Sequence, residues 1–344
     1  MKYRQEAPFA VQIELVEGCQ LRCPFCALNG IRGKENNFKF MTEKTLAKTL
    51  SQIVDAGWNP RIEFAMHGEP TMHPDYVGMI ALARTCAPKL QLMLTSNGGG
   101  ILRKPGAAEN IRALFDAGLN ILALDDYEGV RIVDKIVEAL HADQKTLDYL
   151  EQQHNLAIYR YPDDPEGNPH KRRRLSDRVL TIIRDISTVE KGKGTHSLLN
   201  NHAGVGAPPN NRGQGKRCAK PFRELSVRWD GNIAICCNDF RGVYKCGNIV
   251  KDGLDAVWNG DAMVAARKKL YHGMRDFGPC KGCDAVSYRV GFLPDKLGKQ
   301  TLPKPSKYDL QVIEKACAGS SYTKPVLRPW ELPNAKSVSK KVTK

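Results

Sequence analysis

The sequence predicts an α/β protein, in which repeated strand–helix units form a parallel sheet and a smaller α+β domain follows. Short apolar runs alternate with amphipathic segments over residues 9–186, which is typical of such units. At Cys218 the character changes to a hairpin pattern with spaced cysteines. The chain has 344 residues, enough for two domains with their own cores.

The elements of the first domain follow from apolar periodicity and from the residues that start and stop helices. We expect strands over residues 9–15, 61–66, 91–95, 119–124, 157–161 and 179–186. We expect helices from 42 to 57, from 74 to 86, over 105–117 and over 127–139, with Pro74 as a start and Gly57 and Gly118 as stops. The alternation of strand and helix implies that the strands are parallel.

Polar residues follow the first four predicted strands, where each strand ends. They are the cysteine loop 17–26, the segment His67-Gly68-Glu69-Pro70, the pair Ser96 and Asn97, and the pair Asp125 and Asp126. Chemistry in βα barrels lies at the C-terminal strand ends, so we expect these groups to line one site.

Cys19, Cys23 and Cys26 are separated by three and two residues. Three thiolates can hold three corners of a [4Fe–4S] cluster and leave the fourth iron open to a small molecule. Structural zinc requires four ligands, which this triplet does not supply. The spacing therefore favours a redox cluster with an open iron.

This triplet, with Phe25 directly before its last cysteine, resembles the signature of the radical S-adenosylmethionine (radical SAM) superfamily. The resemblance implies a partial (βα)6 TIM-like barrel, with the methionine part of SAM bound to the open iron. The segment after the second strand is similar to the motif that binds the SAM amino group, with His67 in place of the usual first glycine. The implied cofactor-binding residues are Phe25, Gly68, Glu69, Pro70, Ser96 and Asn97.

A second cysteine pattern begins with Cys218, Gly231 and Cys236 and ends with Cys280 and Cys283. It resembles the SPASM domain of radical SAM enzymes with auxiliary clusters. Only Cys317 follows, so the resemblance is to the shorter twitch version, which implies one auxiliary [4Fe–4S] cluster on Cys218, Cys236, Cys280 and Cys283. A structural zinc site on the same four cysteines is the alternative.

The remaining candidates have weaker signals. The glycine spacing selects Cys236 over its neighbour Cys237, which leaves Cys237 spare. We expect Cys86, Cys246 and Cys317 to be structural, and His67 and His73 to make polar contacts or to be spectators. No catalytic residue is identified, and the acids after the fourth strand, Asp125 and Asp126, are the candidates.

The predicted domains follow one another along the chain without interleaving. Residues 1–190 form the radical SAM barrel, 191–217 a linker, 218–290 the twitch/SPASM-like domain and 291–344 a basic, partly disordered tail. The sequence has no apolar run long enough for a membrane span, and its many reduced thiols predict a cytoplasmic protein.

The predicted activity is reductive cleavage of SAM and oxidation of a peptide, a protein side chain or a small molecule. The electron donor would be a protein such as flavodoxin or ferredoxin. The net charge of +15 motivates an alternative, a radical enzyme that modifies tRNA or DNA. A metal-stabilised binding protein without catalysis is the third hypothesis, and SAM turnover would discriminate it from the other two.

Overall fold

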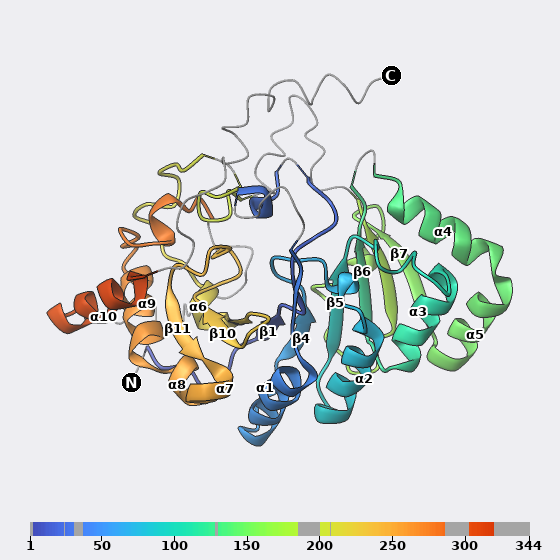
Figure 1. The fold of residues 1–344 in the computed structure, drawn as a ribbon, viewed down its shortest axis with the longest axis horizontal. Helices are drawn as coiled ribbons and strands as arrows, with labels where there is room; N and C mark the ends of the chain where they lie inside the picture. Colours follow the sequence, from blue (N-terminus) through green and yellow to red (C-terminus); the bar gives the residue numbers. More distant parts are fainter. Residues whose placement is uncertain are drawn as a thin grey trace. The chain divides into compact units, whose positions relative to one another are not determined.

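The computed structural model describes residues 3–23, 25–30, 37–127, 130–184, 200–206, 208–285 and 303–319. The chain forms two compact units (Figure 1). The C-terminal unit comprises Met1–Gln12, Leu21–Phe38 and Asn200–Lys344, and the sheet unit comprises Ile13–Gln20 and Lys39–Leu199. The units are thus interleaved along the chain, whereas the predicted domains are consecutive. Parts of the predicted linker and tail, 191–199, 291–302 and 320–344, lie outside the described residues.

Five parallel strands form the frame of the sheet unit, which confirms the predicted α/β class. Their order is β4 (Arg61–Phe64), β5 (Leu92–Ser96), β6 (Ile121–Asp125), β8 (Val179–Ile183) and β7 (Ala157–Tyr161). The last two strands exchange places relative to the chain, since β8 pairs with both β6 and β7. β7 alternates between half-buried and exposed residues, as suits a strand with one solvated face, whereas β8 is buried along most of its length.

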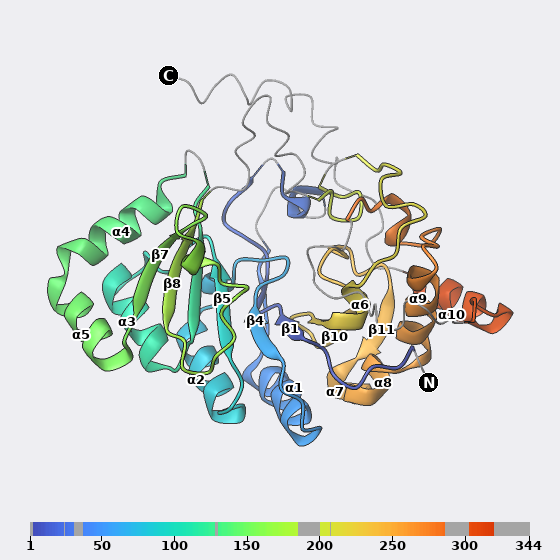
Figure 2. The same ribbon diagram turned by 180° about the vertical axis from the view of Figure 1, so that it is seen from behind.

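The helices of this unit are α1 (Glu43–Asp55), α2 (Tyr76–Cys86), α3 (Ala107–Asp116), α4 (Ile132–Ala142) and α5 (Gln144–His154). The first begins as predicted, because the Thr42 hydroxyl accepts the Thr45 N–H at 3.2 Å. α4 starts later than predicted, since Arg131 has a left-handed backbone at φ 51°. α5 is a helix that the sequence analysis missed. Figures 1 and 2 show α3, α4 and α5 together along the outer side of β6–β8.

Two short pieces of strand carry the polar loops. β1 (Ala10–Ile13) is shorter than predicted, and the Ile13 carbonyl accepts the N–H of Ala65, just after β4, at 3.2 Å. β2 (Val16–Glu17) then pairs antiparallel with β3 (Lys39–Phe40). The loop that contains the cysteines therefore begins at β2 and returns to the sheet unit at β3.

The C-terminal unit contains α6 (Lys220–Arg223) and the antiparallel strands β9 (Glu224–Val227), β10 (Asn232–Ala234) and β11 (Lys245–Asn248). The predicted hairpin is confirmed, and Gly231 in its turn has the positive φ of 81° that favours glycine. Three helices follow, α7 (Ile249–Asp252), α8 (Leu254–Trp258) and α9 (Asp261–Tyr271).

A further helix, α10 (Lys307–Cys317), lies within the segment predicted as a partly disordered tail. Ser306 and Asp309 form a capping box at its start. Asp309 also accepts a hydrogen bond from Lys268 of α9 at 2.8 Å, so this part of the predicted tail is ordered. Within the described residues, none of the helices is both long and apolar enough to cross a membrane.

Candidate metal centres and cofactor site

The Glu69 carboxylate connects the ends of two neighbouring strands in the sheet unit. Its Oε1 accepts the N–H of Thr71 at 2.9 Å and the hydroxyls of Thr71 and Ser96, each at 2.6 Å. Its Oε2 accepts the N–H of Asn97 at 2.7 Å. Burial raises the pKa of Glu69, while these four hydrogen bonds favour the charged form. The carboxylate therefore fixes the loops after β4 and β5 to one another.

The next contact extends this network to the first cysteine. The Asn97 side-chain amide donates to Cys19 Sγ at 3.4 Å, and its oxygen accepts from Gln20 Nε2 at 2.7 Å. The oxygen also accepts the Gly99 N–H at 2.9 Å. The structure thus brings together Cys19, Glu69, Ser96 and Asn97, which the sequence placed at three separate strand ends.

Glycines allow these loops to approach so closely. Gly18 has φ 136°, a conformation that favours glycine, directly before Cys19. A Cβ at Gly68 would lie 1.8 Å from the carbonyl oxygen of Val16, and a Cβ at Gly99 would lie 1.8 Å from Gln20 Nε2. The Gly68 backbone therefore lies directly against the chain that leads to Cys19.

Cys23 and Cys26 belong to the C-terminal unit. The Cys26 N–H donates to the Cys23 carbonyl at 2.9 Å, and the Asn29 side chain donates to the same carbonyl at 2.6 Å. η1 (Ala27–Gly30), a short 3-10 helix, follows. These bonds form a compact turn that holds two of the predicted iron ligands and Phe25 in a defined backbone conformation.

The four C-terminal candidates are buried in the same unit, with exposed fractions of 8% for Cys218, 9% for Cys236, 8% for Cys280 and 7% for Cys283. Burial raises the pKa of Cys280, and the nearby Cys218 and Cys283 raise it further. Burial likewise raises the pKa of Cys236, which interacts with Cys280 and Cys218 as well as with its neighbour Cys237. Cys218 and Cys280 therefore each interact electrostatically with the other three thiols. In the described part of the chain, no three His, Cys, Asp or Glu side chains already converge on a metal position.

Cys237 has different surroundings from Cys236. The Lys220 ammonium donates to Cys237 Sγ at 3.1 Å and to Glu224 Oε2 at 3.2 Å. Lys220 is only 9% exposed, and although burial lowers its pKa, Cys237 and Glu224 raise it well above the usual range. The Cys237 thiol is thus engaged by a buried cation, and its assignment as the spare cysteine of the pair remains a prediction.

Two family profiles match the chain. Residues 13–151 match the radical SAM superfamily, and residues 218–284 match the SPASM iron–sulfur cluster-binding domain. The chain is a radical SAM enzyme with a C-terminal SPASM domain. No curated protein sequence matches it significantly.

Solved radical SAM structures share this fold. BtrN in complex with AdoMet and 2-DOIA is 19% identical, with a TM-score of 0.55 over 81% of this chain and 93% of that one. BtrN in an open conformation is 16% identical, with a TM-score of 0.53 over 83% of this chain and 98% of that one. The structural similarity to BtrN shows that this radical SAM enzyme has the predicted fold. The fold of radical SAM proteins such as BtrN includes a partial TIM barrel.

The residues of the radical SAM domain fit a [4Fe–4S] cluster and SAM, and the SPASM domain implies auxiliary iron–sulfur chemistry. Four buried thiols that repel one another as thiolates are a donor set that iron or zinc cations would stabilise. Near Cys19, the Asn97 amide donates to the sulfur, and the Gly68 backbone lies against the carbonyl groups of Val16 and Gly18. SAM contacts of Phe25, Gly68, Pro70, Ser96 and Asn97 remain predictions. The SAM contact of Glu69 also remains a prediction, and its carboxylate accepts four hydrogen bonds within the protein.

Asp125 and Asp126 lie at the C-terminal end of β6, as the sequence indicated. The Tyr127 hydroxyl donates to Asp125 Oδ2 at 3.3 Å, and the Asp126 N–H donates to the Ile183 carbonyl at 2.9 Å. A catalytic role for either carboxylate remains a prediction.

A buried pair escaped the sequence analysis. His67 Nδ1 lies 2.9 Å from Glu14 Oε1, and both side chains are 0% exposed. Glu14 directly follows β1 and His67 follows β4, so the pair joins two strand ends beside the predicted cofactor segment. The sequence feature that could have indicated this pair is the acidic residue Glu14 directly after the first strand. His73 is structural, because it accepts the Asp75 N–H and donates to the Met41 carbonyl at 3.0 Å.

A Glu69→Gln substitution tests the carboxylate network. Glutamine replaces one acceptor oxygen with a donor that faces the N–H and O–H donors of Thr71, Ser96 and Asn97. We expect the free energy of unfolding to fall by about 1–3 kcal/mol, because a buried hydrogen bond is lost and a donor is left unpaired. SAM affinity, measured by equilibrium dialysis, should fall as well. Unchanged stability and affinity would contradict the assigned role.

A Lys220→Met substitution tests the buried cation. Removing a positive charge beside Cys236 and Cys237 should stabilise the oxidised auxiliary cluster, so its potential should fall by about 59 mV, a tenfold change in a one-electron equilibrium. Redox titration followed by electron paramagnetic resonance measures this shift. Lys44→Met, which removes an exposed lysine on α1 of the sheet unit, is the matched control and should leave the potential unchanged.

Proposed function

We propose that this radical SAM enzyme reductively cleaves SAM and oxidatively modifies a peptide, a protein side chain or a small molecule. When bound, the cluster and SAM supply a 5′-deoxyadenosyl radical that abstracts a hydrogen atom from the substrate. The observation that carries the proposal is the continuous network from Cys19 through Asn97 to Glu69 and Ser96. It combines a thiol from the signature triplet with the two strand ends that the family resemblance assigns to SAM.

The four buried cysteines of the SPASM domain support the oxidative character of the reaction. A cluster with four protein thiolates has no open iron, so these residues would hold an electron acceptor and not a substrate ligand. The adjacent Lys220 ammonium adds positive charge, which favours acceptance of an electron. The substrate would then lose one hydrogen atom, one electron and one proton in total.

The enzyme needs a reductant and a substrate. For the reductant we propose a small electron-transfer protein such as flavodoxin or ferredoxin. The nucleic-acid alternative rests on net charge, and part of that charge serves the fold. In the basic run, Arg172 donates to the Glu166 carbonyl at 2.8 Å and its guanidinium lies 5.2 Å from the ring centre of Tyr159.

Reductive SAM cleavage is the direct test. The chain is reconstituted anaerobically with iron and sulfide, reduced with dithionite and incubated with SAM. Chromatography should detect 5′-deoxyadenosine only when reductant and iron are both present. A zinc-loaded or iron-free chain is the control. If the fully reconstituted chain forms no 5′-deoxyadenosine, the proposed function is wrong.

A further inference from the structure

Two chain segments run side by side next to the predicted SAM site. One leads from β1 to the first cysteine of the triplet, and the other leads from β4 to Glu69. At the start of both segments, the Ala65 N–H donates to the Ile13 carbonyl at 3.2 Å. At their end, the Glu69 N–H donates to the Gly18 carbonyl at 2.8 Å. Main-chain hydrogen bonds therefore join the two segments at both ends.

Glu14 and His67 form a side-chain link between these two bonds. The carboxylate oxygen of Glu14 and Nδ1 of His67 are 2.9 Å apart, and both side chains are fully buried. Burial removes the hydration of a carboxylate, and a direct hydrogen bond from the imidazole N–H offsets part of that cost. The link therefore holds the middle of one segment against the other.

The backbone on either side of His67 is constrained as well. Met66, directly before it, has φ 89°, a left-handed conformation that favours glycine. Such strain persists only where the surrounding structure holds the backbone in place. Directly after His67, a Cβ at Gly68 would lie 1.8 Å from the carbonyl oxygen of Val16. The contact with Glu14 thus fixes a short piece of chain between a strained residue and a crowded one.

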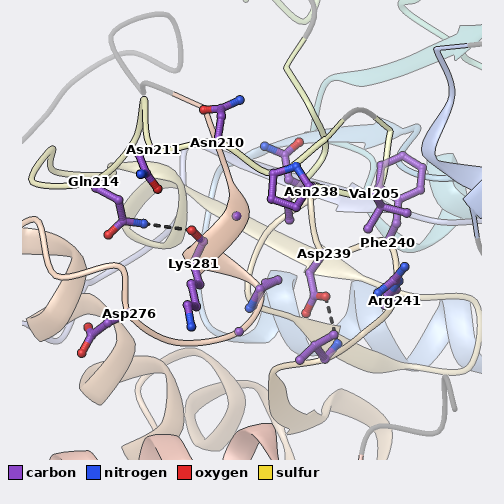
Figure 3. A pocket seen from close by; sticks show the side chains of 17 residues that line it. Val205, Asn210, Asn211, Gln214, Asn238, Asp239, Phe240, Arg241, Asp276 and Lys281 are labelled. Carbon is purple, nitrogen blue, oxygen red and sulfur yellow. Dashed lines mark hydrogen bonds between the residues drawn. The ribbon is translucent and has the colours of Figure 1, made fainter. Parts of the chain in front are cut away.

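The pair belongs to the sheet unit and does not line the large pocket of the C-terminal unit. That pocket has a volume of ≈ 920 Å³ and is lined by residues from the loop segments 203–214, 238–243 and 276–282 (Figure 3). Because the side chains of Glu14 and His67 also have no exposed surface, they act on a bound ligand through the backbone that they hold.

We propose that Glu14 and His67 are positioning residues, which hold the predicted SAM-binding segment at Gly68 and Glu69 against the chain that leads to Cys19. The inference rests on the proposed function, which assigns this segment to SAM. It goes beyond the family motif, because the glycine that usually stands at the place of His67 has no side chain to form such a link.

The test compares SAM binding by the anaerobically reconstituted parent chain and by variants of the pair. Equilibrium dialysis of the unreduced chain gives the SAM dissociation constant without any turnover. His67→Leu removes the link, and we expect the constant to rise by roughly tenfold or more, as for other residues that orient the groups of a site. His67→Asn places an amide N–H near the position of Nδ1 and should restore much of the affinity.

The matched control separates positioning from a loss of stability. Glu63→Gln weakens a buried ion pair on the same strand, in which Arg61 Nε donates to Glu63 Oε1 at 2.8 Å. It should lower the melting temperature and leave SAM affinity unchanged. If His67→Leu does not fold, Glu14→Leu/His67→Leu takes its place, because replacing both members of a buried pair by apolar residues often costs little stability. This double variant should bind SAM as weakly as expected for the single one.

Thermal unfolding and iron content verify that each variant is folded and loaded. The proposal is overturned if a folded chain without the link binds SAM as tightly as the parent, or if Glu63→Gln weakens binding to the same degree. A parent chain that binds SAM but forms no 5′-deoxyadenosine after reduction contradicts the proposed function and leaves this comparison valid. A parent chain that binds no SAM contradicts both.

Discussion

The Cys23→Ala variant is expected to form no 5′-deoxyadenosine above background when it is reduced in the presence of SAM. Cys23 is the central member of the triplet, and two thiolates cannot hold three corners of a cubane with an open iron. The turn around it should survive, because Asn29 and Cys26 bond to the backbone carbonyl of Cys23, which the substitution leaves in place. Chromatographic analysis of single and multiple turnovers measures the effect.

Cys86→Ala is the matched control for this loss. Cys86 ends α2, and burial raises the pKa of its thiol, as expected for a structural cysteine. Its removal should leave 5′-deoxyadenosine formation near the parent rate. Normal turnover by the Cys23 variant would contradict the assignment of the triplet as the SAM-binding cluster.

Changing Cys280 and Cys283 together to Ala is expected to separate SAM cleavage from oxidation. The parent should bind about eight irons per chain and the double variant about four, if one auxiliary cluster is present. SAM cleavage without substrate should persist, because the triplet is intact. Oxidised product from a substrate peptide should fall by orders of magnitude, since the electron of the substrate radical has no acceptor.

The double variant carries a structural risk, because metal binding can contribute to the folding of a small domain. Cys86→Ala/Cys317→Ala removes the same number of thiols outside the proposed ligand sets, and it should keep about eight irons. Elution volume and circular dichroism identify unfolded samples. A folded Cys280→Ala/Cys283→Ala chain that oxidises substrate at the parent rate would show that the cluster is only structural.

Sequence patterns were sufficient for features that depend on local spacing. The period of apolar residues predicted the parallel strands, and the Asp230-Gly231 turn predicted the β9–β10 hairpin. The polar residues after successive strands also predicted that Cys19, Glu69 and Asn97 meet, since parallel strands end at one edge. In these cases the residues themselves determine backbone direction and side-chain period.

Features set by tertiary packing could not be predicted in this way. The position of β8 between β6 and β7 depends on which strand can be buried on both faces. The Glu14–His67 pair joins residues 53 positions apart, and no local pattern reports such a contact. The same holds for the hydrogen bonds from Thr71 and Asn97 to Glu69, which is also a predicted SAM acceptor.

We propose that Cys19, Cys23 and Cys26 hold a cluster with an iron that is open to SAM. Electron paramagnetic resonance of the reduced Cys280→Ala/Cys283→Ala chain tests it most directly, because this variant should retain only the cluster held by Cys19, Cys23 and Cys26. Addition of SAM is predicted to shift the g-values of that cluster, and S-adenosylhomocysteine, without the transferable methyl group, should give a different spectrum. A signal that does not change when SAM is added in excess would contradict the assignment of the triplet as the SAM-binding cluster.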